Sequence, residues 1–192
     1  ANGYNSANGR AVLFILNLQD GSVLKKIDTG AAGNSIVTKN GLSTPLAVDV
    51  PRAVDRDGNG DPADKIVDYI YAGDLAGNMW KFDVTGSSAS TWSVAGGTSP
   101  LFVACASAAT PCSDANRQPI TAKAQAIAAS GPGQSGGQRL LFGTGKYFED
   151  GDNLVTGDPQ MQSLYGLWDY GATIAGRNEL QAQAIDAEVT LG

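Results

Sequence analysis

Apolar and polar residues alternate with a period of two through much of the chain, which is the pattern of half-buried β-strands. In residues 11–28 this pattern predicts an apolar strand at 11–17 and a returning strand at 22–28. Gln19-Asp20-Gly21 lies between them, and an Asp-Gly pair between alternating segments is a strong signal for a hairpin turn. The chain is therefore expected to begin with an antiparallel hairpin.

The same plan returns in residues 66–84. A strand is predicted at 66–72, a turn at "GDLAGN" and a second strand at 78–84. Successive side chains of a strand point to opposite faces. The face that holds Met79, Lys81 and Asp83 should therefore lie opposite to the face that holds Trp80, Phe82 and Val84.

A third version of the hairpin is predicted toward the C-terminus. It consists of "QRLLFGTGKYFED" and "QSLYGLWDY", with a longer connection between the two strands. Similar hairpins at a spacing of roughly 60 to 75 residues indicate a repeat architecture. The predicted fold is all-β, with each repeat a small antiparallel sheet.

Two segments have ambiguous patterns. Residues 120–130, "ITAKAQAIAAS", are rich in alanine and resemble a helix, yet Ile120 and every second residue after it would line one face of a strand. We favour the strand because small residues suit sheets that stack closely about a central axis. Residues 177–189 fit a helix and a strand equally well.

Composition and charge exclude several classes of function. The 192 residues, 42% of them hydrophobic, suffice for one globular domain with a core. A net charge of −6 argues against nucleic acid and anionic membranes as partners and favours cations. The chain has no histidine, which excludes triads with a His base and His-ligated zinc. Its longest obvious apolar run, residues 11–16, is far too short to span a membrane.

Cys105 and Cys112 bracket a stretch of small and polar residues that is typical of a surface loop. Their spacing allows a local disulfide and does not fit a CxxC redox or zinc motif. Two free thiols are the alternative. A disulfide would favour an exported protein. The first ten residues lack the charged and apolar regions of an export signal, so such a signal would lie outside this sequence.

An acidic segment directly precedes the strand predicted at 66–72. It places five aspartates within residues 55–68. Asp55, Asp57 and Asn59 have the alternating spacing of a calcium loop, and Gly60 stands where such loops turn sharply. The next residue, Asp61, would supply its backbone carbonyl.

The ligand that closes this site is left open between Asp64 and Asp68. Neither has the spacing that an EF-hand loop requires for its final carboxylate. A solvated turn is the alternative interpretation, but so many carboxylates in a compact turn would repel one another without a cation. Magnesium fits less well because it prefers fewer protein ligands and keeps its waters.

Several motifs together resemble the C-terminal β-propeller domain of the PilY/PilC family of type IV pilus adhesins. They are "NGLSTPLAVD", "DRDGNGDPADKIVDYIYAGDLAGNMWKFD", "RQPIT", "LLFGTGKYF" and "QSLYGLWD", and the match runs in order from about residue 3 to 185. The resemblance implies a propeller of about seven blades with a calcium site in an inter-strand loop. The fold expected for this chain is therefore a partial or modified β-propeller, with several four-stranded antiparallel blades and a calcium-binding loop. It aligns Asp55, Asp57 and Asn59 with the first three ligands and Asp68 with the last, while four additional residues at 61–64 leave Asp64 as a competitor.

The resemblance also implies a function and a location. It indicates a non-catalytic domain that acts in pilus biogenesis, adhesion and the control of pilus extension against retraction. The implied partners are pilin or minor pilin subunits and a host-cell surface receptor. The implied location is outside the cytoplasm, at the bacterial cell surface, the pilus tip, the outer membrane or the periplasm.

The length of the chain limits this interpretation. At roughly 40 to 50 residues a blade, 192 residues cannot close a ring of seven blades. Residues 1–192 are therefore expected to form a single propeller-type domain that is a fragment of a larger propeller. Open sheet edges would then favour a homodimer through strand pairing.

Two other classes of protein share parts of the pattern. Quinoprotein dehydrogenases carry a blade turn similar to "AGDLAGNMW", but they also commonly carry a vicinal cysteine pair, which is absent here. We expect Trp80 and Trp168 to pack in blade cores rather than to support a cofactor. An integrin-like module would need several calcium loops, and the acidic cluster at 149–160 matches no ligand template and is expected to be a solvated loop.

Overall fold

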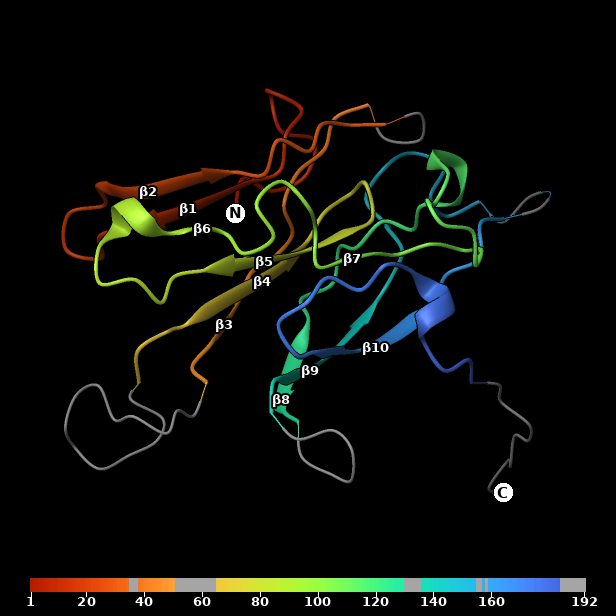
Figure 1. Cartoon of the computed structure of the whole chain (residues 1–192). Helices are drawn as coiled ribbons and strands as arrows, with labels where there is room; N and C mark the ends of the chain where they lie inside the picture. Colours follow the sequence, from red (N-terminus) through yellow and green to blue (C-terminus); the bar gives the residue numbers. More distant parts are fainter. Residues whose placement is uncertain (35–37, 51–64, 130–135, 155–156, 158, 184–192) are drawn as a thin grey trace, which may run out of the picture.

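The computed structural model describes residues 1–34, 38–50, 65–129, 136–154, 157 and 159–183 (Figure 1). The described elements are short β-strands joined by turns, with three short 3-10 helices: η1 (Ala89–Thr91), η2 (Asp114–Asn116) and η3 (Arg177–Glu179). The strands form three separate antiparallel sheets. The all-β prediction is therefore confirmed.

The first sheet is the predicted N-terminal hairpin. It pairs β1 (Val12–Leu16) with β2 (Val23–Asp28) in antiparallel register. Gly21 adopts a left-handed backbone with φ of 72° and donates its N–H to the carbonyl of Asn17. Glycine reaches this conformation without steric cost, which is why the Asp-Gly pair marks the turn.

The central sheet contains β3 (Leu46–Val48), β4 (Tyr69–Gly73), β5 (Asn78–Asp83), β6 (Ser93–Val94) and β7 (Phe102–Val103). Both β6 and β7 pair with β5, β6 near its C-terminal end and β7 near its N-terminal end. These two short strands share one position beside β5. The sheet therefore has four strand positions, the outermost of which is interrupted.

The third sheet has the order β10-β9-β8. It contains β8 (Gln125–Ala128), β9 (Gln138–Gly143) and β10 (Leu164–Asp169), so the third predicted hairpin is also present. The sequence predicts several four-stranded blades, whereas the sheets of the described residues contain two, three and five strands. The segments that connect the strands contain glycine and proline. Alternation of apolar and polar residues cannot show whether such segments form further strands.

Both faces of the central sheet are buried. On one face, Ala72, Trp80 and Phe82 pack against Leu13 and Ile27 of the N-terminal hairpin. On the other face, a second apolar cluster packs against the C-terminal sheet and contains Tyr71, Met79, Phe102, Ile120, Leu140, Phe142, Tyr165 and Leu167. The central sheet thus lies between the other two sheets (Figure 1). The predicted alternation of Met79 against Trp80 and Phe82 is confirmed.

Several strand boundaries differ from the sequence expectation. The strand predicted from residue 66 begins at Tyr69, and residues 66–68 lead into it. The alanine-rich segment forms a strand, β8, but only over Gln125–Ala128. The ambiguous segment 177–189 begins with the short helix η3, and the structure describes it no further than residue 183.

In the described part of the chain, we find no helix with the length and apolar character needed to cross a membrane.

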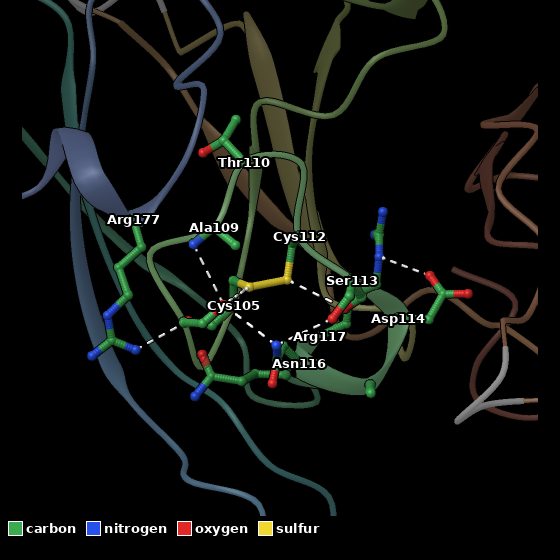
Figure 2. The surroundings of a disulfide bond; sticks show 12 residues. Cys105, Ala109, Thr110, Cys112, Ser113, Asp114, Asn116, Arg117 and Arg177 are labelled. Atoms are coloured by element: carbon green, nitrogen blue, oxygen red, sulfur yellow. Dashed lines mark hydrogen bonds and ion pairs between the residues drawn. A yellow bond between two sulfur atoms is a disulfide. The ribbon is translucent and has the colours of Figure 1, made fainter.

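The two cysteines form a disulfide, as the spacing allowed (Figure 2). Cys105 is buried and Cys112 is half-buried. Arg177 donates a hydrogen bond of 3.0 Å from its guanidinium to the carbonyl of Cys105, and the Cys105 N–H donates to the Tyr165 hydroxyl at 3.2 Å. The disulfide therefore constrains a loop that is hydrogen-bonded to Arg177 of η3 and to Tyr165 of β10.

We expect the double substitution Cys105→Ser and Cys112→Ser to lower the free energy of unfolding by about 2.5 kcal/mol. The estimate follows from the loop-closure entropy that a short disulfide loop removes from the unfolded chain. Urea denaturation of the oxidised protein and the variant measures the difference. Equal midpoints, with the disulfide verified by mass spectrometry of the alkylated and unreduced protein, would contradict the expectation.

Candidate functional site

Asp68 is the one predicted calcium ligand that the structure describes. It is fully buried and lies immediately before β4. Its N–H donates to the carbonyl of Val48 at 3.0 Å, and its carboxylate accepts the N–H of Val50 at 2.9 Å. The carbonyl of Asp68 accepts the N–H of Val84 at 2.9 Å. These bonds hold the carboxylate at the base of the acidic segment, between the end of β3 and the start of β4.

The other predicted ligands lie in residues 51–64, outside the described part of the chain. They are Asp55, Asp57, Asn59, Asp61 and Asp64. Their assignment as ligands remains a prediction, and so does the choice between Asp64 and Asp68 as the closing ligand. The structure joins the two sides of this segment, because the Val50 N–H donates to the Asp68 carboxylate and the Lys65 N–H donates to the Asp49 carboxylate.

Asp49 is a carboxylate at the same place that the sequence reasoning missed. It follows β3 directly and is half-buried. Its Oδ2 accepts the N–H of Lys65 at 2.8 Å, and Lys65 adopts a left-handed backbone with φ of 58°. Its Oδ1 is buried, and no donor reaches it among the residues that the structure describes. Asp49 could have been found from the sequence by predicting that the strands on either side of the acidic segment pair in antiparallel fashion.

The described groups fit a calcium ion in chemical type. Calcium binds carboxylate and carbonyl oxygens, and Asp49 presents a buried carboxylate oxygen that lacks a hydrogen-bond partner in the described part of the chain. A search of the described residues alone finds no group of three or more His, Cys, Asp or Glu side chains placed to hold a metal. A complete ligand set would therefore have to include residues of the acidic segment.

A cavity of about 650 Å³ adjoins the residues that lead to Asp68. Its apolar walls come from the N-terminal hairpin and the central sheet and include Ile15, Val67, Ile70, Val84 and Trp92. Among its lining residues, the polar side chains are the hydroxyls of Thr85 and Ser87. Such walls suit apolar contact rather than acid–base chemistry.

Asp74 organises the turn between β4 and β5. It is fully buried, and its Oδ2 accepts hydrogen bonds from Asn40 Nδ2 at 3.0 Å, Asn78 Nδ2 at 2.8 Å and Trp80 Nε1 at 2.8 Å. Its Oδ1 accepts the N–H of Asn78 at 2.8 Å. Burial raises the pKa of this carboxyl, and the donated hydrogen bonds oppose the rise because they favour the ionised form. The Asp74 carboxylate therefore joins Asn40, Asn78 and Trp80 through hydrogen bonds and stabilises the turn.

A second buried charged group joins the central and C-terminal sheets. The Lys81 ammonium lies 2.8 Å from a carboxylate oxygen of Asp169, and the Tyr71 hydroxyl donates to the same carboxylate at 2.6 Å. The ammonium also lies 4.0 Å from the centre of the Tyr69 ring. Burial and the neighbouring Asp169 carboxylate raise the pKa of the Tyr71 phenol, which therefore keeps its proton and remains a donor.

The second acidic cluster is held by local contacts. Lys146 forms ion pairs with Glu149 and Asp152, and the Asp152 carboxylate accepts the N–H groups of Phe148 and Glu149. Hydrogen bonds from Lys146 lower the pKa of Glu149, and hydrogen bonds from backbone N–H groups lower the pKa of Asp152. This is an exposed loop, as expected, although Asp158 lies outside the described residues.

The expectation for the two tryptophans holds for one of them. Trp80 is buried in the core between the first two sheets. Trp168 is only half-buried. Its ring lies 5.0 Å from the ring of Tyr170, tilted by 46°, and its indole N–H donates to the carbonyl of Gly136. The prediction for Trp168 was wrong because its face of β10 lies outside the described apolar clusters.

Antiparallel sheets that follow one another along the chain and pack face to face are the arrangement of blades in a β-propeller. A sequence model of the PilY1 β-propeller domain matches residues 1–188. The chain belongs to the PilY1 β-propeller family.

Individual relatives agree with this membership. The chain is 41% identical over 198 residues to a type IV pilus biogenesis factor PilY1 homolog of Xylella fastidiosa, covering 97% of this chain and 12% of that protein. It is 34% identical over 212 residues to the type IV pilus biogenesis factor PilY1 of Pseudomonas aeruginosa, covering 97% of this chain and 16% of that protein. The chain thus spans less than one fifth of either relative.

A solved structure shares the fold. The crystal structure of the P. aeruginosa PilY1 C-terminal domain superimposes with a TM-score of 0.69 and 32% sequence identity. The match covers 93% of this chain and 36% of that chain. The described sheets therefore correspond to 36% of that solved chain.

Proposed function

We propose that this chain is a non-catalytic, calcium-binding part of a type IV pilus biogenesis factor. The observation that carries the proposal is membership of the PilY1 β-propeller family, whose relatives are named as type IV pilus biogenesis factors. Those names give no support to the quinoprotein alternative. The apolar walls of the cavity beside Asp68 also favour a binding role over catalysis.

The calcium ion would be bound by the acidic segment and the groups at its base. Asp55, Asp57 and Asn59 would supply side-chain oxygens and Asp61 its backbone carbonyl, and Asp64 or Asp68 would close the site. Bound calcium would neutralise the clustered carboxylates. The residues at the base, which already hold β3 against the start of β4, would then be fixed in one arrangement.

The proposed partners are pilin or minor pilin subunits, with a host-cell receptor as a further partner and the bacterial surface or pilus tip as the location. In this proposal calcium fixes the surface around the acidic segment and so controls whether that surface binds its partner. The state of the site would thereby set whether the pilus stays extended or is retracted. Open strand edges would additionally allow a homodimer.

We expect calcium to raise the melting temperature of the unmodified chain and to have no effect on the Asp55→Ala, Asp57→Ala variant. Binding to the native state alone stabilises it by about 2.7 kcal/mol at a concentration one hundred times Kd. For a domain of this size that corresponds to a rise of roughly 5 to 10 °C. Differential scanning fluorimetry in calcium and in chelator measures the rise. Equal melting temperatures of the unmodified chain in both conditions would contradict calcium binding.

The functional part is tested in bacteria that carry the same two substitutions in the full-length protein. We expect fewer surface pili and reduced twitching motility at equal protein abundance. Asp114→Ala with Asp150→Ala is the matched control, because it removes the same charge from two exposed positions. Normal piliation and motility in the first strain, with calcium binding lost, would leave calcium as a stabilising element only.

A further inference from the structure

We propose that the open edge of β10 is a docking site for an extended segment of a partner protein, which pairs with β10 as a fourth strand of the C-terminal sheet. This site does not depend on the proposed binding of calcium. The strand order of the sheet is β10-β9-β8, so β10 has a neighbouring strand on one side only. In the described part of the chain, no other strand pairs with it.

The free edge of β10 presents backbone groups that another strand can bind. The Thr144 N–H donates to the Ser163 carbonyl at 3.0 Å, so the hydrogen-bonded pairs between β9 and β10 fall on residue 163 and every second residue after it. The backbone groups of Leu164, Gly166 and Trp168 therefore point away from β9. Donors and acceptors that alternate along such an edge match the backbone of an added strand.

A cavity of about 590 Å³ lies beside this edge, lined by residues 163–166 of the chain and, across from them, by residues 179–183. The segment that follows β10 does not fill it. The Ile174 N–H donates to the Leu101 carbonyl next to β7, and the Arg177 guanidinium donates to the Ser163 hydroxyl at 3.0 Å. The described residues after β10 thus border the cavity without backbone pairing to β10.

The central sheet shows that the position beside a third strand accepts a further strand. β5 is the third strand of its sheet, as β10 is of the C-terminal sheet, and β6 and β7 both pair with its outer edge. Those two strands follow β5 in the chain and return to it, whereas the described residues that follow β10 take a different course. A separate segment, which we assign to a partner protein, therefore supplies the strand beside β10.

β10 lacks the features that keep an exposed edge from pairing. Proteins commonly protect such edges with lysine, proline or a β-bulge. β2, on the far side of the central sheet, contains Lys25 and Lys26, and its pairing with β1 is irregular between Ile15 and Leu16. β10 contains neither lysine nor proline, and its register with β9 is regular throughout. Its edge is therefore suited to pairing.

The outer face of β10 indicates which side chain the partner strand carries. Leu164 is 80% exposed and Trp168 is half-buried, while Gly166 between them has no side chain. Leu141 lies opposite Gly166 on β9, on the same face, and is also exposed. A large apolar side chain opposite an edge glycine covers it and reaches the diagonal neighbours. The partner segment is therefore extended, with a large apolar residue facing Gly166.

The blocked peptide Thr-Val-Thr-Phe-Thr-Val-Thr tests the proposal on the full chain. In the free chain, the N–H groups of Leu164, Gly166 and Trp168 should exchange rapidly with solvent. The peptide should slow this exchange about tenfold or more, as measured by nuclear magnetic resonance. In isothermal titration, alanine in place of the central phenylalanine should raise the Kd about tenfold, because less apolar area is buried.

Two variants locate the binding. Leu164→Lys places a charge on the edge and should raise the Kd of the phenylalanine peptide about tenfold, whereas Val23→Lys, at an exposed position of β2, should leave it unchanged. Gly166→Val occupies the space that the phenylalanine would cover. Valine fits there, because the atom nearest to an ideal Cβ is Leu141 Cδ2 at 3.4 Å. This variant should bind the phenylalanine and alanine peptides equally.

Other results would overturn the proposal. Slow exchange of these N–H groups in the free chain at every protein concentration would show that the chain's own residues occupy the edge. Protection that appears only as the protein concentration rises would assign the edge to a second copy of the chain. Rapid exchange that about 1 mM peptide leaves unchanged would show that the edge binds no added strand. A Kd that Leu164→Lys does not alter would place the peptide elsewhere on the protein.

Discussion

Asp74→Ala is expected to lower the free energy of unfolding by about 3 kcal/mol or more, because it removes the common acceptor of several buried hydrogen bonds. The substitution leaves the side-chain N–H groups of Asn40, Asn78 and Trp80 without their common acceptor inside the protein. Each buried donor that loses its partner carries a desolvation cost of about 1 to 3 kcal/mol. Replacement by alanine also opens a void in the turn between β4 and β5.

Urea denaturation followed by tryptophan fluorescence measures this loss, with the slope m compared between variants. Asp150→Ala is the control, because an exposed carboxylate outside any such network should change stability by less than about 0.5 kcal/mol. A loss below about 1 kcal/mol for Asp74→Ala would show that the turn does not depend on this carboxylate.

Lys81→Met should be nearly as damaging, with an expected loss of about 3 to 5 kcal/mol. It leaves the Asp169 carboxylate, whose side chain is only 1% exposed, without its cation. The methylene stem of the lysine is replaced by a chain of similar length, so the loss reflects the charge rather than the volume. Because this pair joins two sheets, the effect should reach the packing between them.

A double variant separates the charge from the hydrogen bonds. In Lys81→Met with Asp169→Asn, both charges are gone, while an amide oxygen remains to accept the hydroxyl of Tyr71. We expect this double variant to be more stable than Lys81→Met alone in the same urea titration. A double variant that is less stable than either single variant would contradict the interpretation, since it would mean that the pair does not act through its charges.

Several features of this protein were determined by local sequence. Period-two alternation predicted three hairpins, and all three are present. The Asp-Gly pair at residues 20–21 specified the first turn because glycine reaches the left-handed backbone there. The spacing of Cys105 and Cys112 allowed the disulfide that the structure contains. These predictions succeeded because each depends on residues that are close together in the chain.

Only the tertiary structure shows which parts of the chain cover each face of a strand. A pattern of alternation shows that a strand has two faces, but it does not show that both faces of β5 are buried against different sheets. Nor does it show that Tyr71 bonds to Asp169, 98 residues away. The half-burial of Trp168 was mispredicted for the same reason, because burial depends on a distant partner surface.

The candidate site also combines features that local sequence predicts with features that only the tertiary structure shows. The acidic spacing predicted a calcium loop from residues within one short segment, where ligand geometry follows from the local chain. That Asp49 accepts the N–H of Lys65, on the far side of this segment, follows only from the tertiary structure. Its unpaired oxygen is a property of burial. Burial depends on which parts of the chain pack together, and the sequence pattern does not record that.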